Sequence, residues 1–149
     1  MERYNALPDD KKQVHILFLE SLKDYHLDEE NRLFVHAGFT NVNGIHHEYF
    51  TRMAYWDRTL WETALALNPA LDTQHPHYPK RFNHYKEIFI GHTPVSRTAG
   101  TKPMQKANIW NVDTGAAYRG PLTLLDADTK EFWQSDSVDT LYPDEGGRN

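Results

Sequence analysis

Apolar residues at helical spacing predict two amphipathic helices. The first follows Pro8, Asp9 and Asp10, which are typical of a helix start. Its apolar face comprises Val14, Leu17, Phe18, Leu22 and Tyr25. The second helix is predicted over residues 50–65, where Phe50, Met53, Asp57, Leu60, Trp61, Ala64 and Leu65 share one face. Residues 68–81, rich in Pro, His and Tyr, predict an irregular loop.

Short apolar runs predict strands between and after these helices. Buried strands are predicted over residues 32–36, 87–90 and 107–112. Two further apolar segments, 122–125 and 131–133, flank the polar turn 126–130 and predict a β-hairpin. This mixture of helices and strands predicts an α/β fold.

Three of the predicted strands end at polar segments that contain glycine. These segments are His36-Ala37-Gly38, Gly91-His92-Thr93 and Asp113-Thr114-Gly115. The ends of strands are common positions for functional sites, because a rigid sheet holds the loop residues in place. Imidazoles from two neighbouring strand ends can share a transition metal at about 2.0–2.1 Å. Of the nine histidines, His36 and His92 are therefore the best candidates for a metal site.

Composition excludes several classes of protein. The 149 residues suit one domain, and 39% hydrophobic residues can form a core. The net charge of −5 comes from interspersed acidic and basic residues, so we expect no nucleic-acid partner. No apolar run approaches the roughly 20 residues that span a bilayer, and we expect no membrane association. The absence of cysteine excludes disulfides and thiolate metal sites, and we expect a cytoplasmic protein.

The order of motifs resembles the C-terminal half of the calcineurin-like metallophosphatases, in particular the bacterial serine/threonine phosphatases. The motifs are VHAGF at 35–39, WDR at 56–58, GHTPV at 91–95 and NVDTGA at 111–116. The resemblance extends from about residue 7 to residue 134. It implies a part of the four-layer α/β/β/α sandwich, a mixed sheet with flanking helices. Residues 1–142 would be the C-terminal portion of that domain, and 143–149 a flexible tail.

The resemblance also implies roles for individual residues. His36 and His92 would be ligands of one metal in a dinuclear centre of Mn, Fe or Zn. Arg58 would bind the substrate phosphate, for which a planar guanidinium is well suited. A supporting loop would comprise Asn111, Asp113, Thr114 and Gly115. In the family, two cations activate a bridging hydroxide for in-line attack on a phosphate monoester.

The chain departs from the family in what it lacks. The family's first half supplies DxH, GDxxDRG and GNH[DE] motifs, and none of them occurs in this sequence. These motifs carry the remaining metal ligands, the bridging carboxylate and the general acid. We therefore expect no catalytic residue within this chain, at most one weak metal site, and no activity of the chain alone. The expected explanation is a truncated gene product, an expressed fragment or a misassigned start.

Three functions remain open from the sequence. The first is a phosphoesterase fragment whose intact enzyme acts on a phosphorylated protein or a small phosphoester. The second is a fragment of a dinucleoside-polyphosphate hydrolase, because the motifs of that group are very similar. The third is a non-catalytic module that binds a metal or a partner through His36 and His92. An apolar face left exposed by the missing half would favour a homodimer.

Overall fold

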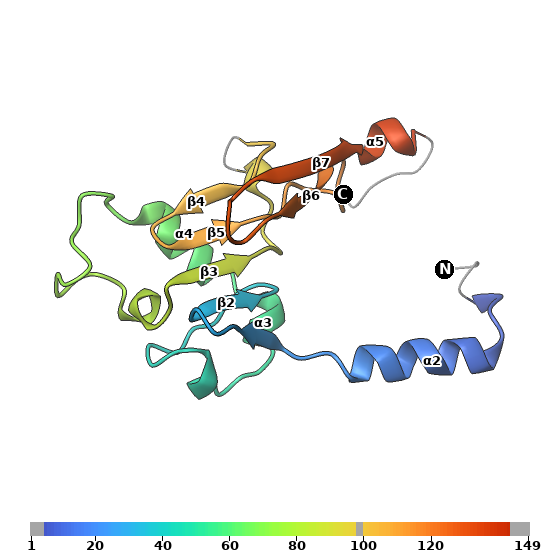
Figure 1. Ribbon diagram of the computed structural model, residues 1–149, viewed down its shortest axis with the longest axis horizontal. Helices are drawn as coiled ribbons and strands as arrows, with labels where there is room; N and C mark the ends of the chain where they lie inside the picture. Colours follow the sequence, from blue (N-terminus) through green and yellow to red (C-terminus); the bar gives the residue numbers. More distant parts are fainter. Residues whose placement is uncertain (1–4, 98–99, 144–149) are drawn as a thin grey trace.

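The computed structural model describes residues 5–97 and 100–143, and a five-stranded mixed sheet forms its centre (Figure 1). The strand order is β1-β2-β3-β5-β4. The strands are β1 (Tyr25–Leu27), β2 (Arg32–Val35), β3 (Glu87–Ile90), β4 (Met104–Lys106) and β5 (Ile109–Asn111). The three central strands β2, β3 and β5 are parallel, whereas β1 and β4 pair antiparallel at the two edges. The predicted α/β class is confirmed at this level.

Short helices cover one face of this sheet. They are α3 (Met53–Trp56) and α4 (Thr59–Ala66), accompanied by the 3₁₀ helices η1 (Ile45–His47), η2 (Lys80–His84) and η3 (Val95–Arg97). Alternate strand residues pack with these helices in one apolar core. Its fully buried members include Leu33, Phe39, Leu60, Trp61, Phe82, Ile88 and Ile109. The predicted strands over 32–36, 87–90 and 107–112 are confirmed, with β5 shorter than expected.

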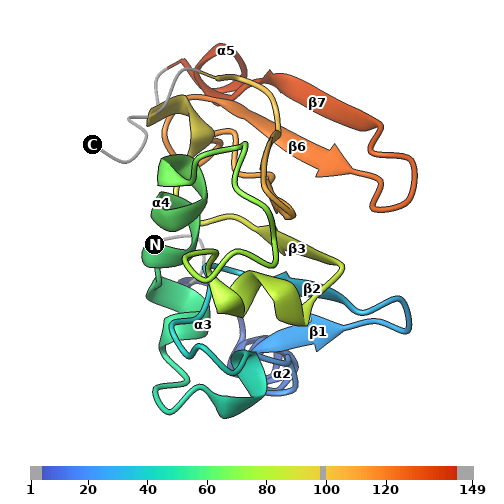
Figure 2. The same cartoon turned by 90° about the vertical axis from the view of Figure 1, so that its left-hand side faces the viewer.

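A β-hairpin lies on the other side of the sheet from α3 and α4 (Figure 2). It comprises β6 (Pro121–Leu125) and β7 (Phe132–Ser137), which pair antiparallel, and α5 (Val138–Leu141) follows. Its turn is held to the sheet, since Lys130 Nζ donates to Glu87 Oε2 at 2.7 Å and lies 5.1 Å from the centre of the Phe89 ring. The predicted hairpin is confirmed. Of the predicted tail, residues 144–149 lie outside the described residues.

The prediction of one helix over residues 50–65 is wrong. The chain instead forms α3 and α4, which are separated by Asp57 and Arg58. Asp57 has an extended backbone with φ −64° and ψ 136°. Its carboxylate accepts hydrogen bonds from the backbone N–H groups of Thr59 at 2.9 Å and Leu60 at 3.0 Å. A carboxylate that satisfies these free N–H groups starts a new helix, so the apolar periodicity continues across a break.

The N-terminal helix also differs from the prediction. Helix α2 (Asp9–Glu20) ends before Tyr25, which belongs to the unpredicted edge strand β1. No residue of α2 is buried, and the helix extends away from the sheet in Figure 1. Its apolar residues therefore do not form the packed face that their spacing predicted. None of the helices in the described residues has the length and apolar character needed to cross a membrane.

The sheet face opposite α3 and α4 carries a row of aromatic residues, and the hairpin turn covers Phe89 of this row with Lys130. We call this face the open face, since an apolar cavity lies beside the hairpin over β1–β3. The strand register aligns His26 with Phe34, Phe34 with Phe89, and Phe89 with Trp110. The Phe34 and Phe89 rings are stacked, with centroids 4.8 Å apart and planes 8° from parallel. Cross-strand aromatic pairs of this kind stabilise neighbouring strands. The strands are therefore apolar on both faces, which is typical of a sheet covered on both sides.

Gly38 provides a test of how the end of β2 packs against the helices. A Cβ atom at this position would lie 2.6 Å from Asp57 Oδ2 and 3.0 Å from Leu60 Cβ. Gly38→Ala should therefore lower the free energy of unfolding by about 1–3 kcal/mol through overpacking. Gly100→Ala is the control, because its nearest contact would be Met104 Cε at 3.6 Å. Urea unfolding measures both, and equal midpoints would contradict the packing described here.

Candidate metal site

The pairing of β2 with β3 brings His36 and His92 together. The two strands run parallel in register, and the backbone N–H of Gly91 donates to the carbonyl oxygen of His36 at 2.9 Å. His36 therefore lies beside Gly91, and His92 is the next residue along the chain. The two imidazole rings have centroids 5.2 Å apart with planes inclined at 60°. The two histidines that the sequence singled out are thus neighbours at the carboxyl ends of adjacent strands.

His92 is held in an unusual conformation. Its φ of 65° lies in the left-handed region, which non-glycine residues seldom adopt. The indole of Trp56 packs edge-on with the His92 ring, with ring centroids 5.5 Å apart and planes at 89°. The His92 ring is therefore in contact with both His36 and Trp56. A left-handed histidine that the surrounding structure fixes is a feature found at ligand sites.

Asn111 connects the β3 and β5 strand ends. Its side chain is fully buried. Nδ2 donates to the carbonyl oxygen of Thr93 at 2.8 Å, while Oδ1 accepts from the backbone N–H of Asp113 at 3.0 Å. A second connection comes from the N–H of Val95, which donates to the carbonyl oxygen of Asp113 at 2.9 Å. These bonds fix the loop after His92 against the loop after β5.

The loop after β5 is in turn closed by its own polar groups. Asp113 Oδ1 accepts from the N–H of Gly115 at 2.9 Å, and Gly115 has a φ of 91° that favours glycine. Thr114 Oγ1 donates to the carbonyl oxygen of Pro121 at 2.7 Å, which joins the loop to the start of the hairpin. The predicted supporting loop, Asn111 to Gly115, thus lies against the histidine loop and links it to β6.

The histidines and the loop after β5 line a cavity of about 240 Å³. Its lining combines the two histidines with the loop after β5 and the start of β6, and includes His36, His92, Asp113, Thr114 and Thr123. Arg58 does not line this cavity. It is exposed at the N-terminal end of α4, two residues after Trp56. The structure therefore does not place the predicted phosphate-binding residue in this cavity, and it is Trp56, two residues earlier, that contacts His92.

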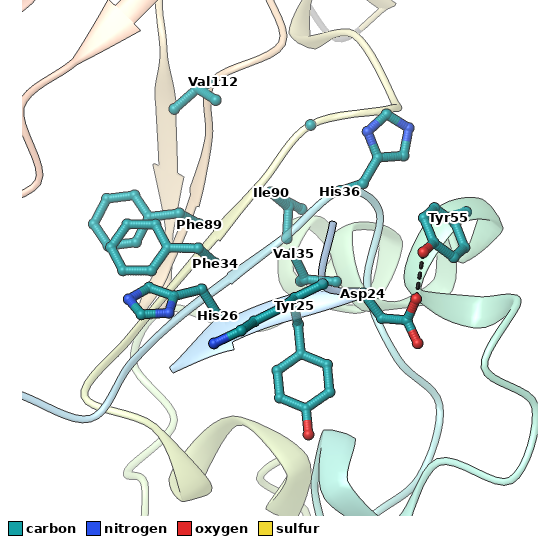
Figure 3. Close-up of a pocket in the computed structure, with 12 residues that line it drawn as sticks. Asp24, Tyr25, His26, Phe34, Val35, His36, Tyr55, Phe89, Ile90 and Val112 are labelled. Carbon is teal, nitrogen blue, oxygen red and sulfur yellow. Dashed lines mark hydrogen bonds between the residues drawn. The ribbon is translucent and has the colours of Figure 1, made fainter. Parts of the chain in front are cut away.

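A larger, mostly apolar cavity of about 500 Å³ adjoins this one at His36, Gly91 and Val112. It lies over β1, β2 and β3, where Phe34 and Phe89 of the open face line it, and extends to Asp24 and to Tyr55 of α3 (Figure 3). Figure 3 shows the Phe34 and Phe89 rings together with His26 beside them, and the Tyr55 hydroxyl directed at Asp24. The candidate site therefore opens onto an apolar surface of the sheet.

The two histidines fit a shared metal ion. A metal bound in the plane of an imidazole at about 2.1 Å lies about 3.2 Å from the ring centre, so tetrahedral ligation places two ring centres about 5 Å apart. The observed 5.2 Å agrees with this value. However, the described residues contain no group of three or more His, Cys, Asp or Glu side chains that could hold a metal ion. What they provide is a pair of neighbouring imidazoles.

The sequence did not assign a role to two residues that support the site. Asp57 starts α4 and packs against Gly38. Arg81 is buried and donates to the carbonyl oxygens of Phe39 and Thr59, both at 2.8 Å. Burial lowers the pKa of Arg81, and the nearby carboxylates of Asp57 and Glu48 oppose this shift. An Asp ahead of Arg, Thr and Leu can start a helix, so the sequence at the WDR motif could have indicated the role of Asp57. Nothing in the sequence around Arg81 indicated that this side chain is buried.

The connection through Asn111 can be tested by mutation. Asn111→Ala leaves the Thr93 carbonyl and the Asp113 N–H without this partner, so the free energy of unfolding should fall by about 2–4 kcal/mol. Asn83→Ala is the control, because Asn83 is exposed and donates one bond to the Thr73 carbonyl oxygen. Chemical denaturation measures both. A loss at Asn111 no larger than at Asn83 would contradict the proposed connection.

Comparison with known proteins leaves this site to be judged from its own geometry. No family model matches the chain, and no match is found among curated proteins. The site is characterised by the contact between His36 and His92 and by the left-handed backbone of His92. The buried Asn111 joins the loop after His92 to the loop after β5.

Proposed function

We propose that this chain carries half of the metal site of a dinuclear metallophosphatase of the serine/threonine phosphatase type. The observation that carries the proposal is the pair of imidazoles from two parallel strand ends, with ring centroids 5.2 Å apart. The order of the VHAGF, WDR, GHTPV and NVDTGA motifs supports the same assignment. The intact enzyme would hydrolyse a phosphate monoester in a phosphorylated protein or a small molecule.

Each residue of the half-site has a defined task in this proposal. His36 and His92 bind one divalent cation through neutral imidazole nitrogens. Such a cation polarises phosphoryl oxygens and lowers the pKa of bound water. Arg58 donates hydrogen bonds from its planar guanidinium to the phosphate oxygens, and its exposed position at the start of α4 leaves it accessible. Trp56 packs edge-on with the His92 ring and helps to hold it in place.

The remaining ligands and the general acid would have to come from residues outside this chain. The open face and the exposed apolar side chains of the hairpin support this view, because contiguous exposed apolar surface is typical of an interface. In the proposed intact enzyme they would belong to the inner layers of a four-layer α/β/β/α sandwich. The exposed apolar residues of the hairpin are Leu122, Leu124, Phe132 and Trp133. We place this enzyme in the cytoplasm, with which the absence of cysteine is compatible.

A non-catalytic metal-binding module is the second candidate. It is favoured by one observation, namely that the described residues supply two imidazoles and no third His, Cys, Asp or Glu in the same group. Two ligands retain a cation more weakly than the three or four of a typical protein site. Activity of a complemented chain, rather than metal binding, separates the two candidates.

Metal binding can be tested by titration calorimetry with Mn²⁺. The chain should bind Mn²⁺ weakly, and His36→Ala and His92→Ala should each reduce the affinity by at least about tenfold, since each removes one of two ligands. His47→Ala is the matched control, because His47 lies in η1 and does not line the cavity that holds His36 and His92. Binding that survives both ligand substitutions would disprove this assignment.

Catalytic activity can be tested with an aryl phosphate in the presence of Mn²⁺. The chain alone should show no turnover above background, because one pair of imidazoles supplies neither a second cation nor a general acid. Addition of sequence that carries DxH, GDxxDRG and GNHD motifs ahead of residue 1 should restore turnover, and Arg58→Ala should then reduce it. Turnover by the chain alone, or none after complementation, would contradict the proposed function.

A further inference from the structure

Helix α2 exposes an apolar surface that an isolated helix cannot sustain. None of its residues is buried, and Val14, Leu17 and Phe18 are 61%, 56% and 62% exposed. Leu19 and the following Leu22 are 61% and 54% exposed. A helix of 12 residues is marginal in water by itself, and helices of this length obtain most of their stability from packing. The helix therefore requires an apolar surface to cover it.

The open face offers such a surface in the same chain. Its apolar cavity of about 500 Å³ spans β1, β2 and β3 and is lined by Phe34, Phe89 and Val112. The 12 residues of α2 extend over about 18 Å, and the two strand spacings from β1 to β3 cover about 10 Å. The helix is thus long enough to cross the cavity over β1–β3, which lies beside the place where the hairpin turn holds Lys130 on the Phe89 ring.

The connection between α2 and β1 is short. Helical hydrogen bonding continues past the end of α2, because the N–H of Leu22 donates to the carbonyl oxygen of Leu19 at 3.2 Å. Pairing in the sheet begins at Tyr25, opposite Val35. Only Lys23 and Asp24 lie between, and the Asp24 carboxylate accepts a hydrogen bond from the Tyr55 hydroxyl. The helix is consequently directed away from the sheet, as Figure 1 shows.

We propose that two copies of this chain exchange their α2 helices, each helix covering the open face of the other copy. The exchange is reciprocal, so both contacts are identical and the dimer closes with twofold symmetry. It buries the exposed side chains of α2 and the open cavity over β1–β3 in a single contact. This inference does not depend on the proposed function, because it uses neither the histidine pair nor Arg58.

The oligomeric state provides the first test. At micromolar concentration, analytical ultracentrifugation should give twice the 17.4 kDa mass of one chain. A variant with Leu17→Asp and Phe18→Asp should be a monomer, because both side chains are exposed in the single chain and would be buried only in the dimer. Val42→Asp is the control, since Val42 is 60% exposed in a loop outside both α2 and the open face, and this variant should remain a dimer. A monomeric parent chain, or a dimer that survives the α2 substitutions, would overturn the proposal.

Cross-linking tests whether the exchanged helix occupies the open face of the other copy. The chain has no cysteine, so single cysteines can be placed without background. A tagged Phe18→Cys chain mixed with an untagged Val112→Cys chain should form a cross-linked heterodimer with a short bismaleimide, whereas Phe18→Cys mixed with Val42→Cys should not. A chain that carries both Phe18→Cys and Val112→Cys should give cross-linked dimers. Cross-linking within single monomers would instead show that α2 folds onto its own sheet and would refute the exchange.

Discussion

The parallel pairing of β2 with β3 is the constraint on which the candidate site depends. Leu33 lies opposite Ile88 and Phe34 opposite Phe89, and the ladder continues to the bond from Gly91 N–H to the His36 carbonyl oxygen. A shift of this register by one residue would reverse the faces of an entire strand and separate the two imidazoles. The buried side chains on the helical face and the stacked rings on the open face both specify the same register. Site geometry is thus a consequence of core packing.

The helices stabilise this arrangement from the covered face of the sheet. Asp57 starts α4 and lies close enough to position 38 to exclude any residue larger than glycine without rearrangement. Arg81 donates to the carbonyl oxygen of Phe39 and to that of Thr59, so it ties the loop after β2 to the same helix. Because Trp56 ends α3 and packs on His92, the break at Asp57 also determines where this indole lies. The break between α3 and α4 at Asp57 therefore influences both the packing of the core and the position of Trp56 beside His92.

Much of the sheet could be predicted from the sequence because its central strands are continuous apolar runs. The runs at 32–36 and 87–90 end in glycine-containing loops, and this pattern was enough to select His36 and His92. The edge strands β1 and β4 were missed because each has only three residues, and pairing rather than composition defines them. The break at Asp57 was missed because apolar periodicity continues through it. Periodicity in α2 likewise indicated an apolar surface but not what would cover it.

The open face imposes a choice between two arrangements. A sheet face with an aromatic row and an apolar cavity is covered in a stable assembly, because contiguous exposed apolar surface of this kind promotes association. In the proposed metallophosphatase, the missing half would occupy this face and complete the metal site. In the exchanged dimer, α2 of a second copy occupies it, and the cavity beside His36 and Val112 is closed. Since one surface accepts one partner at a time, residues that complete the metal site would have to displace the exchanged helix. Under the two proposals, assembly of the catalytic site and dimerisation of this chain would therefore be competing equilibria.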